Sequence, residues 1–210
     1  RKAASARAIE MDPATKLYFV EVEEPDMHKP TGDLERLAHA LKDQWDIDNV
    51  TCDLGVLTKL QPRLRKGNWQ ASVAVYRDHK TDQARILDIW SGLHEGGLYG
   101  LAIDLGSTTV AAHLTDLTTG EVVASAGVMN PQIRFGEDLM SRVSYSMMNP
   151  GGDREMTRAV RDAINTLAED IAKDADIDPS LIFEVVFVCN PVMHHLLLGI
   201  DPVELGQAPF

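Results

Sequence analysis

Residues 102–110 read AIDLGSTTV and place an aspartate, a glycine and three hydroxyl residues between two apolar segments. A tight turn through Gly106 would aim the backbone N–H groups of residues 106–109 into one concavity, and such a nest of amides binds phosphate oxygens. Glycine permits both the tight turn and the close approach of a phosphate. Asp104, at the end of the preceding strand, would hold Mg²⁺ through water, and this ion would bridge the β- and γ-phosphates of a nucleotide. The hydroxyl donors of the predicted phosphate site are Ser107, Thr108 and Thr109.

The same residues also suit a plain hairpin, in which the glycine and the hydroxyl residues serve only the turn between two buried strands. An Asp-x-Gly-Ser/Thr motif is weak by itself. The surrounding order of elements favours the phosphate site, because strands flank the turn on both sides and a helix, a strand and a helix follow. The fingerprints of the P-loop and of the Rossmann dinucleotide site are both absent from the sequence.

The elements that position this turn begin after Gly96 and Gly97. Asp116 and Gly120 suit a tight reversal between the second and third strands. The predicted strands cover residues 98–104, 109–115 and 121–128. A long helix over residues 153–175, capped by Asp153, has the buried stripe Val160, Ile164, Leu167 and Ile171.

Two further elements complete this half of the chain. The apolar segment IFEVVFVCN, residues 182–190, predicts a strand that is buried on both faces. The segment PVMHHLLLG predicts a short helix that ends at Gly199. The predicted order from residue 97 onward is β-β-β-α-β-α.

The earlier half of the chain predicts a smaller module. Residues 1–16 are small or charged without a period and predict a linker. An amphipathic helix over residues 32–45 and a second helix near Pro62 lie between a first strand and a later pair of strands. Residues 17–96 therefore form a predicted α+β domain.

Composition excludes several classes of function. The net charge of −12 disfavours a nucleic-acid partner, because binding would work against the field of the protein. Cys52 and Cys189 stand far apart and outside any Cys-x-x-Cys spacing, which predicts a reducing cytoplasm and no zinc or iron–sulfur site built from these thiols alone. No segment approaches the roughly 18 apolar residues of a membrane span. The sequence predicts a cytoplasmic protein with no membrane partner.

Longer segments carry a resemblance to known proteins. GLAIDLGSTTV and the two strands after it resemble the first phosphate motif of the actin, sugar-kinase and heat-shock-chaperone ATPase superfamily. NPQIRFGEDLMSRVSYS together with MHHLLLGIDPVELGQAPF resembles the reductive activators of corrinoid proteins. The resemblance implies an α/β (α+β) chain in which a small α+β middle domain, residues 17–96, precedes a ribonuclease-H-like half-lobe. This half-lobe, residues 97–210, is the first part of an actin-like ATPase domain.

The family resemblance also implies the chemistry. Its members use ATP and Mg²⁺ to help return an inactive Co(II) corrinoid to Co(I), and the partner is the corrinoid protein of a methyltransferase system. A [2Fe–2S] cluster is expected in the parent protein, in a ferredoxin domain outside this chain. The oligomeric state stays open, and a homodimer is one arrangement.

The resemblance assigns roles residue by residue. Asp104 becomes the catalytic and Mg²⁺-binding aspartate, and Asp138 either caps the helix that follows it or orients a metal-bound water. Pro191 departs from the family pattern, because it removes an amide donor from the turn before Met-His-His. Adjacent His194 and His195 suit packing or an interface better than a shared metal ion or a ligand to the corrinoid cobalt. The predicted cofactor-binding residues are Gly106, Ser107, Thr108, Thr109, Asn130, Gln132 and Asp138.

The chain starts without a methionine and ends in turn-like sequence, so we expect it to be a piece of a longer polypeptide. The opposing half of the nucleotide site would then lie outside it. We expect the parent protein to be an enzyme and the isolated piece to be inactive. Two other functions stay open at this point: a kinase that phosphorylates a small metabolite, and a non-catalytic module that docks onto a corrinoid protein.

Overall fold

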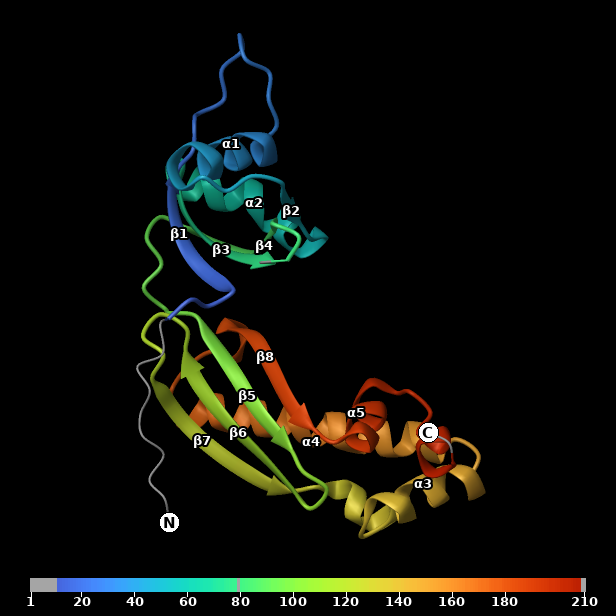
Figure 1. Ribbon diagram of the computed structural model, residues 1–210. Coiled ribbons are helices and arrows are strands. Elements are labelled where there is room, and N and C mark those ends of the chain that lie inside the picture. Colours follow the sequence, from blue (N-terminus) through green and yellow to red (C-terminus); the bar gives the residue numbers. More distant parts are fainter. Residues whose placement is uncertain (1–10, 79, 209–210) are drawn as a thin grey trace. The chain divides into compact units, whose positions relative to one another are not determined.

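The computed structural model describes residues 11–78 and 80–208 (Figure 1). Contacts divide the chain into two compact units, Arg1–Leu98 with Leu117–Gly120, and Tyr99–Asp116 with Glu121–Phe210. Part of the predicted linker, residues 1–10, lies outside the described residues. The rest of that linker is shorter than predicted, because the first strand already begins at Thr15.

The first unit is a four-stranded sheet with two helices. Its strand order is β1-β3-β4-β2, and among the strands of the described residues only the β2–β4 pair is parallel. Only the N3 half of a capping box begins the first helix: the Glu35 carboxylate accepts the Gly32 N–H at 3.0 Å, and Gly32 has no side chain to return a bond. The elements are β1 (Thr15–Glu21), α1 (Asp33–Trp45), β2 (Val50–Cys52), α2 (Leu54–Lys66), β3 (Gln70–Asp78) and β4 (Gln83–Ser91).

A separate hydrophobic core holds this unit together. Leu37 and Leu41 of α1 and Leu60 of α2 pack in one buried cluster with Val73 and Ile89 of the sheet. The apolar spacing of the two helices places these residues on one face, as an amphipathic pattern requires. The structure thus confirms the predicted α+β character of this part of the chain.

The second unit is built on a sheet with the order β7-β6-β5-β8 (Figure 1). β5, β6 and β7 form an antiparallel meander, and β8 adds to β5 in parallel. The predicted strands are confirmed to within one residue at each end. The predicted order lacks one helix, which lies between the third strand and the long helix. The elements are β5 (Tyr99–Leu105), β6 (Thr109–Asp116), β7 (Val122–Met129), α3 (Leu139–Met148), α4 (Gly152–Asp174), β8 (Ile182–Cys189) and α5 (Pro191–Leu198). Short 3₁₀ turns cover Pro131–Phe135, Pro179–Leu181 and Val203–Gly206.

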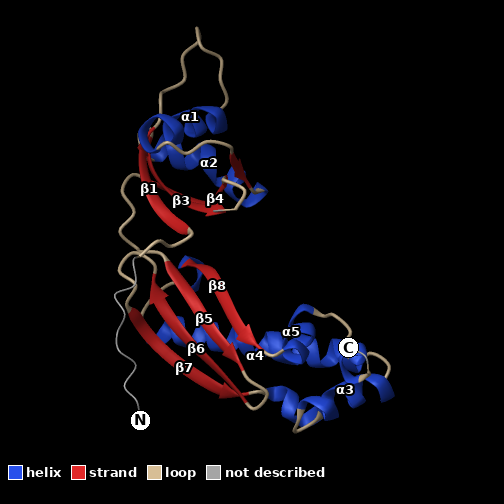
Figure 2. Cartoon of the chain, in the orientation of Figure 1, coloured by secondary structure: helices blue, strands red, loops and turns tan. Residues whose placement is uncertain are grey.

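The sheet of the second unit has one covered face and one open face. Leu101, Ile103 and Leu105 of β5 are buried in the core, whereas the alternating residues Ala102 and Asp104 are exposed. Figure 2 shows α4 running behind the strands on the covered side. The predicted stripe of α4 is confirmed, because all four of its residues belong to this core: Val160, Ile164, Leu167 and Ile171. Alternation along β5 therefore decides which side chains face an open surface.

Two local predictions were wrong. Residues Val185, Val186 and Val188 of β8 are 48%, 58% and 68% exposed, although the strand was predicted to be buried on both faces. β8 is the last strand of its sheet, so only β5 pairs with it among the described residues.

The N-cap of α4 is Gly151, with φ of 83°, rather than Asp153. The positive φ explains why this N-cap is a glycine, because glycine adopts such a backbone conformation without steric cost.

Candidate functional site

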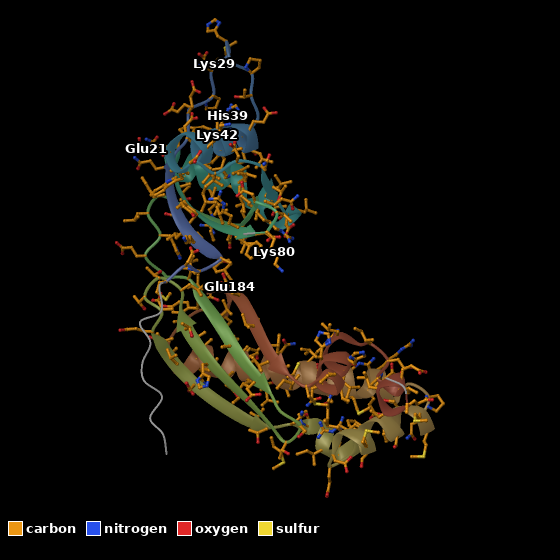
Figure 3. The ribbon with its side chains drawn as sticks, in the orientation of Figure 1. Glu21, Lys29, His39, Lys42, Lys80 and Glu184 are labelled. Carbon is orange, nitrogen blue, oxygen red and sulfur yellow. The ribbon has the colours of Figure 1, made fainter. Side chains whose placement is uncertain are left out.

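The turn between β5 and β6 lies where two parallel strands end. Asp104 is the penultimate residue of β5, and it pairs in register with Val188 near the end of β8. Its side chain is exposed on the open face of the sheet. Glu184, on the same face of β8, pairs with Gly100 and lies toward the opposite end of the strand (Figure 3). Ligands of open α/β sheets bind at the carboxyl ends of the parallel strands, so Asp104 stands where a ligand is expected.

The carbonyl groups of this turn are all engaged by protein donors. Asn130 Nδ2 donates to the Gly106 carbonyl at 2.8 Å, and the Asn130 N–H donates to the Thr108 carbonyl at 2.8 Å. Arg142 Nη2 donates to the Ser107 carbonyl. The Thr109 carbonyl accepts the Gly106 N–H at 3.0 Å within the turn itself. The turn is therefore held in one conformation from its inner side.

This arrangement fixes where the amides of the turn point. In a trans peptide, the C=O of one residue and the N–H of the next point in opposite directions. The inward carbonyls of Gly106 and Ser107 therefore turn the N–H groups of Ser107 and Thr108 away from the buried donors. Within the described part of the chain, neither of these N–H groups donates to a protein acceptor. Two adjacent amides thus face outward beside Asp104.

The predicted nest of amides is narrower than the sequence suggested. The Gly106 N–H is used inside the turn and cannot also bind a phosphate. Glycine is required there for another reason, since a Cβ would stand 2.7 Å from the Thr109 carbonyl oxygen. Thr108 and Thr109 are exposed, so their side chains are accessible to a ligand.

Asn130 and Gln132 lie behind the turn rather than on its open side. Both are fully buried. The Asn130 Oδ1 accepts the Gln132 N–H at 2.9 Å, which caps the 3₁₀ turn Pro131–Phe135. Gln132 Nε2 donates to the Met156 carbonyl of α4 at 3.0 Å. Asn130 thus supports the turn directly, Gln132 supports Asn130 from behind, and neither residue has an open surface.

Arg142 belongs to the same buried group, and the sequence interpretation missed it. Its side chain has no exposed surface, and Nε donates to the Gly136 carbonyl at 2.9 Å. Nη1 lies 3.2 Å from the Met193 sulfur and 3.5 Å from Gln132 Oε1. A usable signal was present, because Arg142 and Val143 stand three and four residues after Leu139 and so share the inner stripe of α3.

Asp138 is the N-cap of α3, so the first of its two predicted roles, capping the helix that follows it, is confirmed. Its carboxylate accepts the Ser141 N–H at 2.7 Å, and hydrogen bonding to Ser141 lowers the pKa of Asp138. The side chain is exposed. Orientation of a metal-bound water by the same carboxylate stays a prediction.

The start of α5 contributes structure at the end of β8. Asn190 caps the helix by accepting the Met193 N–H at 3.0 Å, and Pro191 is its first residue. Pro191 therefore occupies the helix position at which a missing N–H is tolerated. Burial and the nearby Asp104 carboxylate raise the pKa of the Cys189 thiol, which favours its neutral form.

The two adjacent histidines of α5 differ in their surroundings. His194 is exposed, and the rings of His194 and His195 lie 5.8 Å apart at a steep angle. His195 Nδ1 lies 2.8 Å from the Pro191 carbonyl, and since a carbonyl only accepts, this nitrogen carries the proton.

The residues of the turn fit a magnesium nucleotide better than a resident metal. Among the described residues, no group of three or more His, Cys, Asp or Glu side chains could hold an ion. Mg²⁺ does not need such a group, since it keeps several waters and binds through one or two carboxylates plus phosphates. An iron–sulfur cluster does not fit this chain, whose two cysteines, Cys52 and Cys189, belong to different units. Over the same residues, no helix is both long and apolar enough to cross a bilayer.

Comparison with known proteins agrees with the fold and with the motifs. Residues 4–96 match the family described as the RACo linker region, and residues 99–210 match the RACo middle region. The corrinoid activation enzyme RamQ of Eubacterium limosum is 35% identical over 127 residues, which are 60% of this chain and 21% of RamQ. The chain thus spans about a fifth of the length of this relative.

A solved structure extends the similarity to nearly the whole chain. The reductive activator for corrinoid, iron-sulfur protein superposes with a TM-score of 0.85 at 33% identity, over 98% of this chain and 32% of the other. The family matches, the relative and the structure all indicate the same type of protein. The chain belongs to the RACo family of reductive corrinoid activators and comprises the linker and middle regions of that family.

Proposed function

We propose that the protein uses ATP to help reduce an inactive Co(II) corrinoid to Co(I), and that this chain supplies the first phosphate-binding half of the nucleotide site. The observation that supports the proposal most directly is the turn after β5. Its carbonyls are engaged from the inside, its Ser107 and Thr108 N–H groups point outward, and Asp104 is exposed beside them. Residues 97–210 would then form the first lobe of the ATPase domain, and the second lobe would complete the site.

Each residue of the turn has a defined task in this proposal. The amides of Ser107 and Thr108 donate to phosphate oxygens, and the exposed hydroxyls of Thr108 and Thr109 add further donors. Asp104 holds Mg²⁺ through water. When bound, Mg²⁺ neutralises charge on the phosphates. Asn130 and Gln132 keep the turn in place without contacting the nucleotide.

The electron for the reaction and the cobalt that accepts it would both come from outside this chain. Conversion of Co(II) to Co(I) takes one electron, which a reduced [2Fe–2S] cluster of the parent protein would supply. The substrate is the corrinoid protein of a methyltransferase system, in keeping with the relatives, which are a corrinoid activation enzyme and a reductive activator for corrinoid, iron-sulfur protein. Nucleotide binding would close the lobes and thereby promote transfer of the electron.

The test compares Asp104→Asn with the unchanged full natural protein. We expect the variant to lose on the order of 100-fold in the ATP-dependent rate of Co(I) formation, because a neutral amide holds a hydrated cation poorly. Absorbance of the corrinoid at low potential measures this rate. Asp170→Asn is a matched control, since Asp170 is an exposed aspartate on α4. An unchanged rate in Asp104→Asn would contradict the proposal.

The same samples distinguish two other functions of this fold. A phosphorylated small metabolite among the products would indicate a kinase. Capture of the corrinoid protein without ATP dependence, and unaffected by Asp104→Ala, would indicate a docking module. In either case ATP would not accelerate cobalt reduction.

A further inference from the structure

The buried guanidinium of Arg142 lacks an anionic partner. Its side chain has no exposed surface, yet it forms no ion pair with any described residue. Its hydrogen bonds go to the Gly136 and Ser107 carbonyls, and its other close neighbours are the Gln132 side-chain carbonyl and a thioether sulfur. A buried charge that is satisfied only by neutral acceptors is costly, because these acceptors do not cancel its charge.

Nearby acidic groups do not remove this imbalance. Asp138, four residues earlier, raises the pKa of Arg142 by its negative charge, but burial acts more strongly and lowers the pKa overall. The Asp138 carboxylate is exposed and accepts the Ser141 N–H. The positive charge of Arg142 therefore has no ion-pair partner within the described part of the chain, and Asp138 offsets it only in part.

The positive charge of Arg142 lies directly behind the β5–β6 turn. Arg142 donates to the carbonyl of Ser107, and the same peptide unit ends in the N–H of Thr108, which points outward. A donor on a carbonyl polarises its peptide and strengthens the opposite N–H as a donor. The side of the turn that faces a ligand thus has a fully buried cation directly behind it.

We propose that Arg142 is a positioning residue whose buried charge is balanced by the phosphates of the bound nucleotide, acting through the Ser107–Thr108 peptide without touching the ligand. This inference rests on the proposed function, because it requires an anion at the turn. It adds that the fold carries an unbalanced cation whose partner is the polyphosphate itself. The benefit grows with the number of phosphate charges near the turn.

The experiment measures the dissociation constants of AMP, ADP and ATP with Mg²⁺ in the full natural protein and in three variants. Arg142→Met removes the charge while keeping much of the volume, and Arg142→Lys keeps the charge but loses the planar fork. We expect Arg142→Met to lower the preference for ATP over AMP on the order of 10- to 100-fold. Arg142→Lys should retain most of that preference. Arg161→Met is the control, because Arg161 Nε donates to the Leu197 carbonyl at 2.8 Å and contacts no residue of the turn.

The alternatives give different results. A structural role alone would weaken AMP and ATP equally and leave their ratio unchanged, which would overturn the inference. An Arg142→Met protein that is unfolded both with and without ATP would overturn it as well. A folded variant whose thermal midpoint rises less with ATP than that of the unchanged protein, but rises equally with AMP, would support it. If the unchanged protein binds none of the three nucleotides, it is the proposed function that fails.

Discussion

Gly106 stands at a position where even one added carbon collides with the backbone. A Cβ there would lie 2.7 Å from the Thr109 carbonyl oxygen, the same oxygen that accepts the Gly106 N–H. The collision partner is backbone rather than the tip of a flexible side chain. The turn would therefore have to open, and its supporting hydrogen bonds from Asn130 and Arg142 would lengthen.

Replacement of Gly106 by alanine tests this reading. We expect Gly106→Ala to destabilise the second unit by about 1–3 kcal/mol, the range that overpacking costs. Urea denaturation measures the change. Gly55→Ala is the matched control, since a Cβ at Gly55 in α2 meets nothing within 4 Å. Equal stability of the two variants would show that the turn tolerates a side chain.

At the scale of a single element, α3 depends on a charged cap. The Asp138 carboxylate accepts the Ser141 N–H, and its pKa lies below the usual 3.8 in the folded protein. Because the folded pKa is depressed, the contribution to stability is complete above the unfolded value and disappears as the pH falls through the folded value. The cap is thus present at pH 7 and is lost in strong acid.

Asp138→Ala should therefore lower the thermal midpoint at pH 7 and have less effect as the pH falls below about 3.8. Asp138→Asn is the comparison, because asparagine caps helices without titrating. Thermal unfolding followed by circular dichroism from pH 7 to pH 2.5 measures both. A difference between the Ala variant and the unchanged protein that stays constant over this range would contradict the titrating cap.

Elements that depend on local periodicity could be predicted from the sequence, and those that depend on distant partners could not. The stripe from Val160 to Ile171 fixes α4 because a helix of this spacing buries one face. The apolar sequence of β8 does not reveal that β8 is an edge strand, since edge or centre is a property of the whole sheet. Asp104 and the turn carry their own signal. For Arg142 the sequence signals only burial on the inner stripe of α3, because its role follows from contacts with Ser107 and Met193, which are 35 and 51 residues away.

At the scale of the whole molecule, two separate cores support the chain. Leu41 is fully buried in the first unit, and Leu167 is 2% exposed in the second. The two clusters share no residue. Each unit is therefore expected to unfold as its own cooperative transition.

Calorimetry of the 210-residue chain with Leu41→Ala or Leu167→Ala checks this expectation. Each substitution should cost about 2–5 kcal/mol in one transition and leave the other in place. Leu198→Ala is the control, since Leu198 is 52% exposed at the end of α5. A single transition that both substitutions shift equally would show one cooperative unit instead.

The inward hydrogen bonds of the β5–β6 turn also have a kinetic consequence. A loop whose carbonyls are already engaged does not need to order itself around an incoming nucleotide, so association is not slowed by a folding step. The same rigidity means that the turn does not release its ligand by loosening. Under the proposed function, the residence time of a nucleotide, and hence the timing of each reductive cycle, would then be governed by movement of the second lobe that closes over the turn.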